Sequence, residues 1–221
     1  MCAKLLILES PGKVKKVQSF LGPDWKVVAS VGHVRDLPVK EMGVAAPDFK
    51  PHYQPTERGA DVLKRLGALA KQADVVYLAT DPDREGEAIA WQVADALKLK
   101  DAKRVTYGEI TESAVKAAVQ SPRAIDMALV AAQEGRRVLD RFCGYLVSGP
   151  LSRAVGTRLS AGRVQSPALR LVVERERAIT SFVSVTHYGA ELSFEGWKAA
   201  WVVKSWIEPG QEYFPDPALA E

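Results

Sequence analysis

Short apolar runs alternate with helix-like stretches through residues 1–120. The runs 5–8, 25–31, 75–79 and 104–107 have the length and the apolar content of buried strands. Apolar positions recur at helical spacing in 14–21, 62–73, 89–97 and 111–119, and Thr111 can cap the last of these helices. Strands separated by helices of this length predict an α/β domain with a mostly parallel sheet that is covered on both faces. The proline-rich segment 32–56 is expected to be a long, irregular loop.

The pattern changes twice after residue 120. Ser121-Pro122 resembles a helix cap and first turn, and apolar residues at 125, 129, 132, 139, 142 and 146 trace one helical face. We therefore expect a mainly helical segment at 121–182. Beyond it, 187–194 and 197–206 flank Glu195-Gly196 and predict a β-hairpin within an incomplete β-rich segment, 183–221. The tail 209–221, with its prolines, is expected to be loosely ordered.

Composition adds only loose bounds. The chain of 221 residues is 47% hydrophobic, enough for a sizeable core in one large or two small domains. Two cysteines, Cys2 and Cys143, offer neither a disulfide framework nor zinc spacing, which indicates a reducing compartment. No apolar run is long enough to span a membrane and no signal-peptide pattern is present, so we expect a cytoplasmic protein with no membrane partner.

Charge is distributed unevenly along the chain. The net charge is only +3, but residues 136–177 hold nine arginines and no lysine against three carboxylates. The planar guanidinium group of arginine suits phosphate recognition, so this segment favours a nucleic-acid partner. The alternative is a solvated charged surface whose ion pairs contribute little to stability.

Three carboxylates follow the strand predicted at 75–79 on alternate positions: Asp81, Asp83 and Glu85. A strand that delivers three acids into one loop concentrates negative charge, which a divalent cation can stabilise. Oxygen ligands favour a hard ion such as Mg²⁺. An acidic loop that only caps the next helix explains the same residues, and both interpretations remain open at this point.

Glu9 and Lys13 follow the first predicted strand. The carboxyl ends of parallel strands share one edge of a sheet, so Glu9 is expected to lie near the acidic triplet. Lys13, one turn beyond Ser10, can present a cation to an anionic substrate at a helix N-terminus. Glu9 and Lys13 are also four residues apart and could simply pair with each other. Their shared position at the functional edge favours the catalytic interpretation.

Six motifs occur in one order along the chain: ILESPGK at 7–13, SVGHVRDLP at 30–38, ATDPDREGEAIAW at 79–91, GEIT at 108–111, RRVLDRFCGY at 136–145 and SAGRVQS at 160–166. Together they resemble the N-terminal part of type IA DNA topoisomerases, in particular the bacterial topoisomerase I branch, over residues 4–185. Gln92 departs from that branch, which often carries histidine there. The glutamate followed by DxDxE is similar to the TOPRIM fold, which primases, some nucleases and type II topoisomerases share.

The resemblance implies a Rossmann-like TOPRIM domain at 1–120, then the helical segment that binds single-stranded DNA, then a truncated hinge hairpin. It implies an isomerase that cuts one DNA strand through a tyrosine, passes a strand and rejoins the break, and so relaxes negatively supercoiled DNA. Glu9 matches the proton-transfer acid and Lys13 the cation beside the scissile phosphate, while the acidic triplet matches the Mg²⁺ site. A cytoplasmic, nucleoid-associated location follows from such a substrate.

The resemblance also implies DNA-contacting residues. Tyr145 could stack on a base, or it could be an ordinary half-buried tyrosine. Asp140 could orient an arginine, and Arg136 or Arg137 could grip phosphate. The residues that match the family's DNA-binding motifs are His33, Arg35, Arg136, Arg137, Asp140, Tyr145, Ser160, Arg163 and Gln165.

The family's nucleophilic tyrosine stands in an arginine–threonine–acid context, which surrounds none of the six tyrosines here. We therefore expect an N-terminal fragment of a longer enzyme, inactive in relaxation by itself. Two alternatives come from other classes. One is a TOPRIM-type, Mg²⁺-dependent nuclease that activates water at the triplet, and the other is a non-catalytic accessory protein that binds single-stranded DNA.

Overall fold

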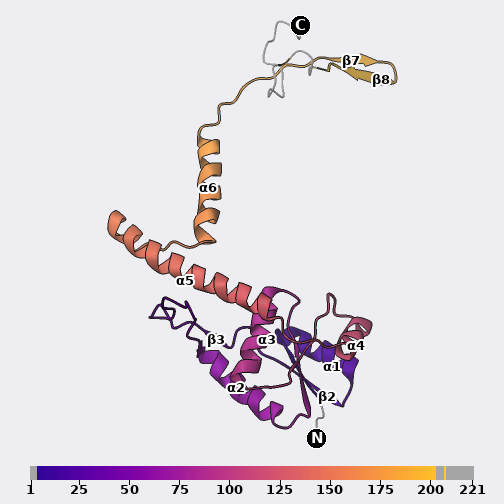
Figure 1. Cartoon of the computed structure of the whole chain (residues 1–221). Helices are drawn as coiled ribbons and strands as arrows, with labels where there is room; N and C mark the ends of the chain where they lie inside the picture. Colours follow the sequence, from indigo (N-terminus) through magenta and orange to yellow (C-terminus); the bar gives the residue numbers. More distant parts are fainter. Residues whose placement is uncertain (1–3, 203–206, 208–221) are drawn as a thin grey trace. The chain divides into compact units, whose positions relative to one another are not determined.

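The computed structural model describes residues 4–202 and Ile207. These residues belong to two compact units, Met1–Arg163 and Val164–Glu221. Elements of the first unit are drawn in indigo to orange in Figure 1. Along the chain they are β1 (Lys4–Leu8), the 3₁₀ turn η1 (Pro11–Lys13), α1 (Val14–Leu21), β2 (Trp25–Ala29), β3 (Arg35–Asp36), β4 (Gln54–Pro55), α2 (Glu57–Ala70), β5 (Val75–Ala79), α3 (Arg84–Ala96), β6 (Lys103–Arg104), α4 (Glu112–Gln120) and α5 (Met127–Val155).

A four-stranded sheet with the order β2-β1-β5-β6 forms the centre of the first unit. All three neighbouring pairs are parallel, which confirms the α/β class and the parallel sheet predicted from the sequence. Leu8 pairs with Ala29 on one side and with Ala79 on the other, so these strands end at the same level. The loops that follow β1 and β5 therefore begin side by side.

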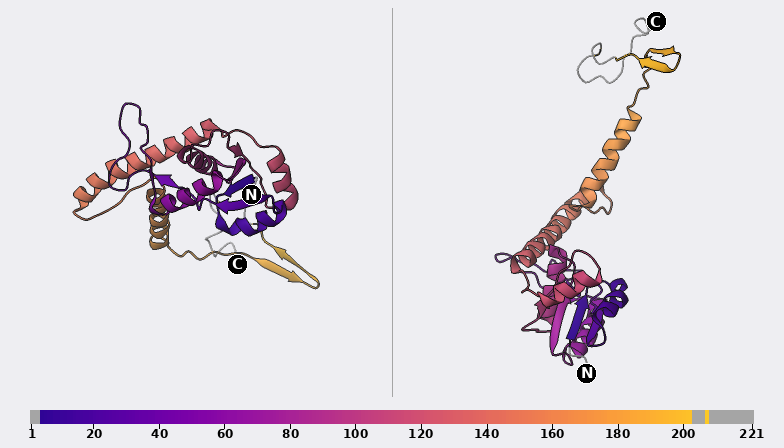
Figure 2. Two further views of the ribbon diagram at one scale, coloured as in Figure 1. Left: turned by 90° about the horizontal axis from the view of Figure 1, so that it is seen from below. Right: turned by 90° about the vertical axis from the view of Figure 1, so that its right-hand side faces the viewer.

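Both faces of the sheet are buried, as the continuous apolar runs predict. Leu5, Ile7 and Leu78 point to one face, where they pack with residues of α2 and α3. Leu6 and Leu8 point to the other face and pack with residues of α1 and α4. The helices on the two sides of the sheet are visible in the two views of Figure 2. A parallel sheet needs this double cover, because both faces of its strands are apolar.

The long loop expected at 32–56 is largely irregular, and its ends are joined by the antiparallel pair β3–β4. It contacts α5 at two points. The rings of Phe49 and Phe142 meet edge to face with their centroids 5.7 Å apart. The Tyr145 hydroxyl donates to the carbonyl oxygens of Val39 and Glu41, at 3.3 and 3.2 Å. The loop is thus held against the helix that carries the arginine-rich motif.

The helical start predicted at Ser121-Pro122 is wrong. Ser121 ends α4, and Arg123 forms an antiparallel bridge with Arg104. Helix α5 begins at Met127, because the Asp126 side chain accepts the amide protons of Ala128 and Leu129 and caps it.

The predicted apolar face of this helix is also shifted by one residue. Val130 and Gln133 are its buried residues, whereas Leu139 and Leu146 are exposed. Val130 stands three residues before Gln133, which places both on one side of the helix. Because the side of α5 that carries Val130 and the polar Gln133 is the buried one, Leu139 and Leu146 remain exposed.

The second unit, described by itself, contains α6 (Gln165–Thr180), β7 (Glu191–Phe194) and β8 (Trp197–Ala200). The two strands form the predicted hairpin around Glu195-Gly196, with Gly196 at φ 86°. Phe194 and Trp197 stack with their ring centroids 4.0 Å apart. Residues 203–206 of the expected second strand, and the tail 209–221, lie outside the described residues. Among the described residues, no helix has the length and apolar content needed to cross a membrane.

Candidate functional site

The carboxyl edge of the sheet gathers the acids that the sequence singles out. Glu9 directly follows β1, and Asp81 follows β5 by two residues. Because Leu8 and Ala79 are paired, the two acids leave the sheet from adjacent strands. The Glu9 carbonyl oxygen accepts the amide protons of Val31 and Gly32, at 2.9 and 3.3 Å, which ties the end of β1 to the segment after β2. Glu9 and Asp81 thus follow neighbouring strands at the same edge of the sheet, as the strand pattern predicts.

Lys13 is the cation at this edge. Its Nζ lies 2.8 Å from Asp81 Oδ1, and both side chains are partly exposed. The lysine therefore pairs with the acidic loop instead of forming the local pair with Glu9 that its spacing allowed. Tyr107 lies beside them, since Lys13, Asp81 and Tyr107 line one cleft of about 360 Å³. Burial and the Asp81 carboxylate raise the pKa of Tyr107 to about 12, so its hydroxyl stays protonated at neutral pH.

Asp83 caps a helix, which is one of the two interpretations of the acidic residues that the sequence allows. It is the N-cap of α3, and its Oδ1 accepts the Gly86 amide proton at 2.7 Å. The loop before the helix is tight: a Cβ atom at Gly86 would lie 2.1 Å from the Asp81 carbonyl oxygen. Glycine is therefore required at this position, and it brings the start of α3 against the end of β5.

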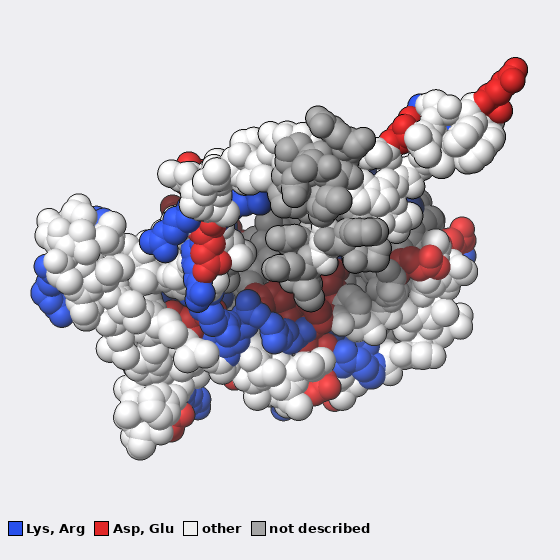
Figure 3. All heavy atoms as spheres, turned by 90° about the horizontal axis from the view of Figure 1, so that it is seen from above, with Lys and Arg blue, Asp and Glu red and all other residues white. Residues whose placement is uncertain are grey.

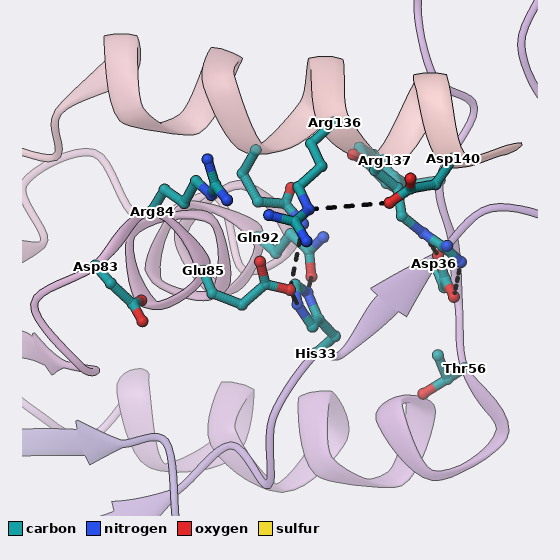
Figure 4. A pocket seen from close by; sticks show the side chains of 12 residues that line it. His33, Asp36, Thr56, Asp83, Arg84, Glu85, Gln92, Arg136, Arg137 and Asp140 are labelled. Atoms are coloured by element: carbon teal, nitrogen blue, oxygen red, sulfur yellow. Dashed lines mark hydrogen bonds and ion pairs between the residues drawn. The ribbon is translucent and has the colours of Figure 1, made fainter. Parts of the chain in front are cut away.

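Glu85 is held by residues from two other elements. Its Oε1 lies 2.9 Å from His33 Nε2, and Gln133 Nε2 from α5 lies 3.5 Å away. The other ring nitrogen of His33 lies 3.2 Å from Gln92 Oε1. Glu85 and Gln92 are seven residues apart on α3, so the imidazole ring spans two turns of one helix face. Figure 4 shows the ring between these two side chains.

A cavity of about 670 Å³ opens beside this cluster. Helix α5 forms one wall, the start and middle of α3 a second, and the long loop with the start of α2 a third (Figure 4). Its lining is mainly polar and charged: His33, Asp36, Tyr53, Thr56, Asp83, Arg84, Glu85, Gln92, Gln133, Arg136, Arg137 and Asp140.

Carboxylates hold the arginines of α5 in place. Arg137 donates to both oxygens of Asp36, at 2.9 and 2.7 Å, in a bidentate pair that joins α5 to β3. Asp140 lies 3.9 Å from Arg136 and 2.8 Å from Arg163. Figure 3, a space-filling view of one face, shows lysine and arginine side chains next to aspartate and glutamate side chains. All of these pairs are partly exposed, so a phosphate group can compete for the guanidinium groups.

Comparisons with known proteins agree with the geometry. The Toprim domain model matches residues 4–112, and the DNA topoisomerase model matches residues 124–211. A plasmid DNA topoisomerase I from Xylella fastidiosa is 60% identical over 98% of this chain and 34% of its own length. Full-length topoisomerase I from Thermotoga maritima superposes with a TM-score of 0.78 at 40% identity, over 97% of this chain and 36% of its own. The chain belongs to the type IA DNA topoisomerase family. It spans about a third of the length of these relatives.

Several residues that the topoisomerase motifs single out line the cavity together. His33, Arg136, Arg137 and Asp140 are among them, as are Asp83 and Glu85. Arg163 joins the group through its ion pair with Asp140. Glu9 and the Lys13–Asp81 pair lie at the adjoining sheet edge.

Other DNA-contact candidates are placed differently. Arg35 Nη2 lies 2.7 Å from Asp95 Oδ2, and its guanidinium group stacks over the rings of Tyr53 and Trp91. Its side chain is only 15% exposed, so it ties the long loop to α3. Tyr145 is partly exposed beneath Arg141, whose guanidinium carbon is 5.4 Å from the ring centroid. Ser160 lies in the exposed segment before Arg163, and Gln165 begins α6 in the second unit.

The acidic triplet has the donor chemistry of a magnesium site. Each carboxylate uses one oxygen in the contacts above and leaves its second oxygen without a donor among the described residues. Those same residues include no group of three or more histidine, cysteine or acidic side chains arranged to hold a metal. Mg²⁺ bound here would be held through one or two of these carboxylates, with water filling most of its shell.

Sequence reasoning missed a buried ion network beneath the acids. Glu87 and Arg104 are fully buried, and Arg104 donates from Nε to Glu87 Oε2 at 2.9 Å. Arg104 also donates to the carbonyl oxygens of Thr80 and Asp81, both at 2.8 Å. Burial disfavours the Glu87 anion, but hydrogen bonds from Arg123 and the Asp126 amide, with the Arg104 charge, lower its pKa to about 2. The available signal was a charged residue, Glu87, followed directly by the apolar stretch AIAW.

Proposed function

We propose that this chain supplies the acidic centre and the single-stranded DNA groove of a type IA topoisomerase. The enzyme would relax negatively supercoiled DNA by cutting one strand, passing a strand and rejoining the break. The observation that carries the proposal is the shared cavity, in which acids of α3 face arginines of α5. An enzyme that acts on a phosphodiester needs groups that bind the phosphates of the DNA backbone. It also needs groups that transfer protons or stabilise charge at the scissile phosphate.

The arginines suit a flexible single strand. Asp36 holds Arg137 in a bidentate pair, and Asp140 holds Arg163 in an ion pair. Both arginines nevertheless remain partly exposed. Backbone phosphates can replace those carboxylates, and Tyr145 offers a ring face on which a base can stack. The cavity wall is therefore preorganised for a phosphate chain.

Glu9 and Lys13 are the proposed catalytic residues. Cleavage leaves a 3′-oxygen that needs a proton, and rejoining must remove that proton again. A carboxyl group at Glu9 can perform both transfers. Lys13 can stabilise the charge that develops on the scissile phosphate, since its ammonium group lies at the same sheet edge.

Asp81, Asp83 and Glu85 are the proposed source of the magnesium ligands, and one or two of their carboxylates would hold the ion. Bound there, Mg²⁺ would offset the charge of the acids and help to orient a DNA phosphate. The nucleophile of the reaction is expected from outside this chain, since none of its tyrosines has the family's arginine–threonine–acid context. We further propose that the protein acts on the nucleoid in the cytoplasm, where its substrate lies.

Binding of a fluorescent single-stranded oligonucleotide tests the groove. We expect Arg163→Ala to weaken binding several-fold and to reduce the slope of log K against log salt by about 0.7, the value for one phosphate contact on a single strand. Arg58→Ala, which removes the same charge from the exposed surface of α2, should leave both quantities unchanged. An unchanged affinity and slope in Arg163→Ala would remove Arg163 from the interface.

A plasmid assay tests the activity. Purified 1–221 should bind DNA without relaxing a negatively supercoiled plasmid, whereas a longer protein that includes a tyrosine-bearing domain should relax it. Relaxation by 1–221 alone would contradict the assignment of the nucleophile to another part of the enzyme. Magnesium-dependent nicking that disappears in Asp83→Ala would instead identify a TOPRIM nuclease.

A further inference from the structure

The Glu87 carboxylate is saturated with donors. Arg123 donates to both of its oxygens, at 2.7 and 2.8 Å. Arg104 adds a third hydrogen bond at 2.9 Å, and the backbone amide of Asp126 a fourth at 2.6 Å. One fully buried side chain thus receives four hydrogen bonds from three residues.

These donors lie on separate parts of the first unit. Arg104 belongs to β6, while Arg123 and Asp126 lie in the connection between α4 and α5. Arg104 and Arg123 also exchange both backbone hydrogen bonds, at 2.9 and 2.8 Å. Asp126 is the N-cap of α5, so the carboxylate on α3 holds the residue at which α5 begins.

Helix α3 therefore carries both Glu87, which holds the start of α5, and Glu85, which is one of the acids that line the cavity. Further along, Val130 is fully buried, and Gln133 approaches Glu85 across the interface. Arg136 and Arg137 follow within about one turn and line the cavity opposite Glu85. A rotation or slide of α5 on α3 would change the distance between the arginines and the acids.

A buried ion network is an expensive way to join two helices, because apolar side chains of similar volume often stabilise as well or better. It does fix geometry, since a bidentate arginine–carboxylate pair tolerates little displacement. We propose that Glu87 and Arg123 are positioning residues, which set the register of α5 on α3 and hence the spacing between the acids and the phosphate-binding arginines. Their role in DNA binding rests on the proposed function.

Arg123→Gln tests the proposal with DNA as the readout. At a temperature below the melting point of the variant, its Kd for a single-stranded oligonucleotide should rise about five- to twenty-fold. The salt slope should stay at the wild-type value, because Arg123 contacts Glu87 and not a phosphate. Arg58→Gln is the matched control and should bind as the wild type does.

Three outcomes of these binding measurements would overturn the proposal. A folded Arg123→Gln chain that melts earlier but keeps the wild-type Kd would make the network purely stabilising. A slope reduced by about 0.7 would make Arg123 a phosphate contact. If Arg123→Gln does not fold, Arg123→Lys keeps the charge without the bidentate geometry, and a wild-type Kd in that variant would also contradict the proposal.

A distance between two spin labels measures the position of α5 without DNA, and it therefore tests this inference independently of the proposed function. Spin labels at Lys64 on α2 and Leu146 on α5, both exposed, report the position of α5 after Cys2 and Cys143 are replaced by serine. Arg123→Gln should shift or broaden the distance distribution, and an unchanged distribution would refute the positioning role. A wild-type chain that binds no single-stranded DNA would refute the proposed function. The spin-label distances would then decide by themselves whether Arg123 positions α5.

Discussion

Lys13 Nζ lies 2.8 Å from Asp81 Oδ1, and this pair joins the first helical turn to the loop that follows β5. The two residues are 68 positions apart in the sequence. They meet because β1 and β5 are parallel neighbours whose carboxyl ends lie at one level. One positive charge thereby offsets part of the negative charge that the acidic loop concentrates.

Lys13→Met should consequently raise the affinity of the chain for a divalent cation. Without its lysine partner, Asp81 exposes an uncompensated carboxylate beside Asp83, and Mn²⁺ as a probe should bind about two- to five-fold more tightly, roughly the value of a surface ion pair. Titration followed by electron paramagnetic resonance measures the free ion. Lys15→Met, which replaces an exposed lysine two residues further along, at the start of α1, provides the control. Equal affinities in the two variants would show that Lys13 does not shield the site.

Gly86→Ala should destabilise the fold by about 1–3 kcal/mol, the usual cost of forcing an extra group into a packed site. The added Cβ would meet the Asp81 carbonyl oxygen at 2.1 Å, so the loop or the helix must move. Gly135→Ala is a matched control inside α5, where only the helix's own backbone lies near the added Cβ and alanine favours the helix. Urea unfolding compares the two variants, and equal stabilities would contradict the tight contact.

Much of this site follows from pattern alone. The run VVYLA predicts β5 with its observed bounds, and the parallel sheet then places Glu9 beside the acidic loop. The family motifs single out Arg136 and Arg137, which line the cavity, but not Arg84, which lines it too. Asp140, expected to orient an arginine, pairs with Arg136 and Arg163. Asp36 and Arg137 meet across 101 positions through an irregular loop, and no local periodicity encodes such a contact.

Competition between local signals accounts for the errors. Ser121-Pro122 is a plausible helix start, but Asp126 caps α5 with two amide contacts while Arg123 remains extended in a bridge to Arg104. The DNA contact predicted for Arg35 stays a prediction, but the partners of its side chain, Asp95 and two aromatic rings, were not foreseen from its motif. Tertiary partners decide such positions, and a sequence does not display them.

Acid should weaken the fold through Glu87. Its pKa in the folded chain is about 2, against an ordinary value of 4.5. Its ionisation therefore stabilises the fold above pH 4.5, and this contribution is lost as the pH falls towards 2. Glu87→Gln should be less stable at pH 7 by about 3–5 kcal/mol, since it leaves buried arginine charge uncompensated.

The variant should also lose part of the pH dependence of stability between pH 4.5 and 2. Urea unfolding at pH 7, 4.5 and 3 measures both effects. Glu112→Gln, which removes an exposed carboxylate paired with Lys116 on α4, should change stability by no more than about 0.5 kcal/mol. A Glu87→Gln chain with the pH profile of the wild type would show that Glu87 does not carry the acid sensitivity.

Asp36→Asn should strengthen DNA binding. In the wild-type chain Asp36 occupies both donor positions of the Arg137 fork, and a phosphate must displace it before it can bind there. Neutral asparagine competes less well, so the Kd for single-stranded DNA should fall about three-fold, and the salt slope should steepen by up to about 0.7. Asp48→Asn removes the same charge from an exposed position of the same loop and controls for net charge. Equal gains in both variants would reveal a general charge effect, whereas weaker binding in Asp36→Asn alone would show that the carboxylate holds Arg137 in its DNA-binding position.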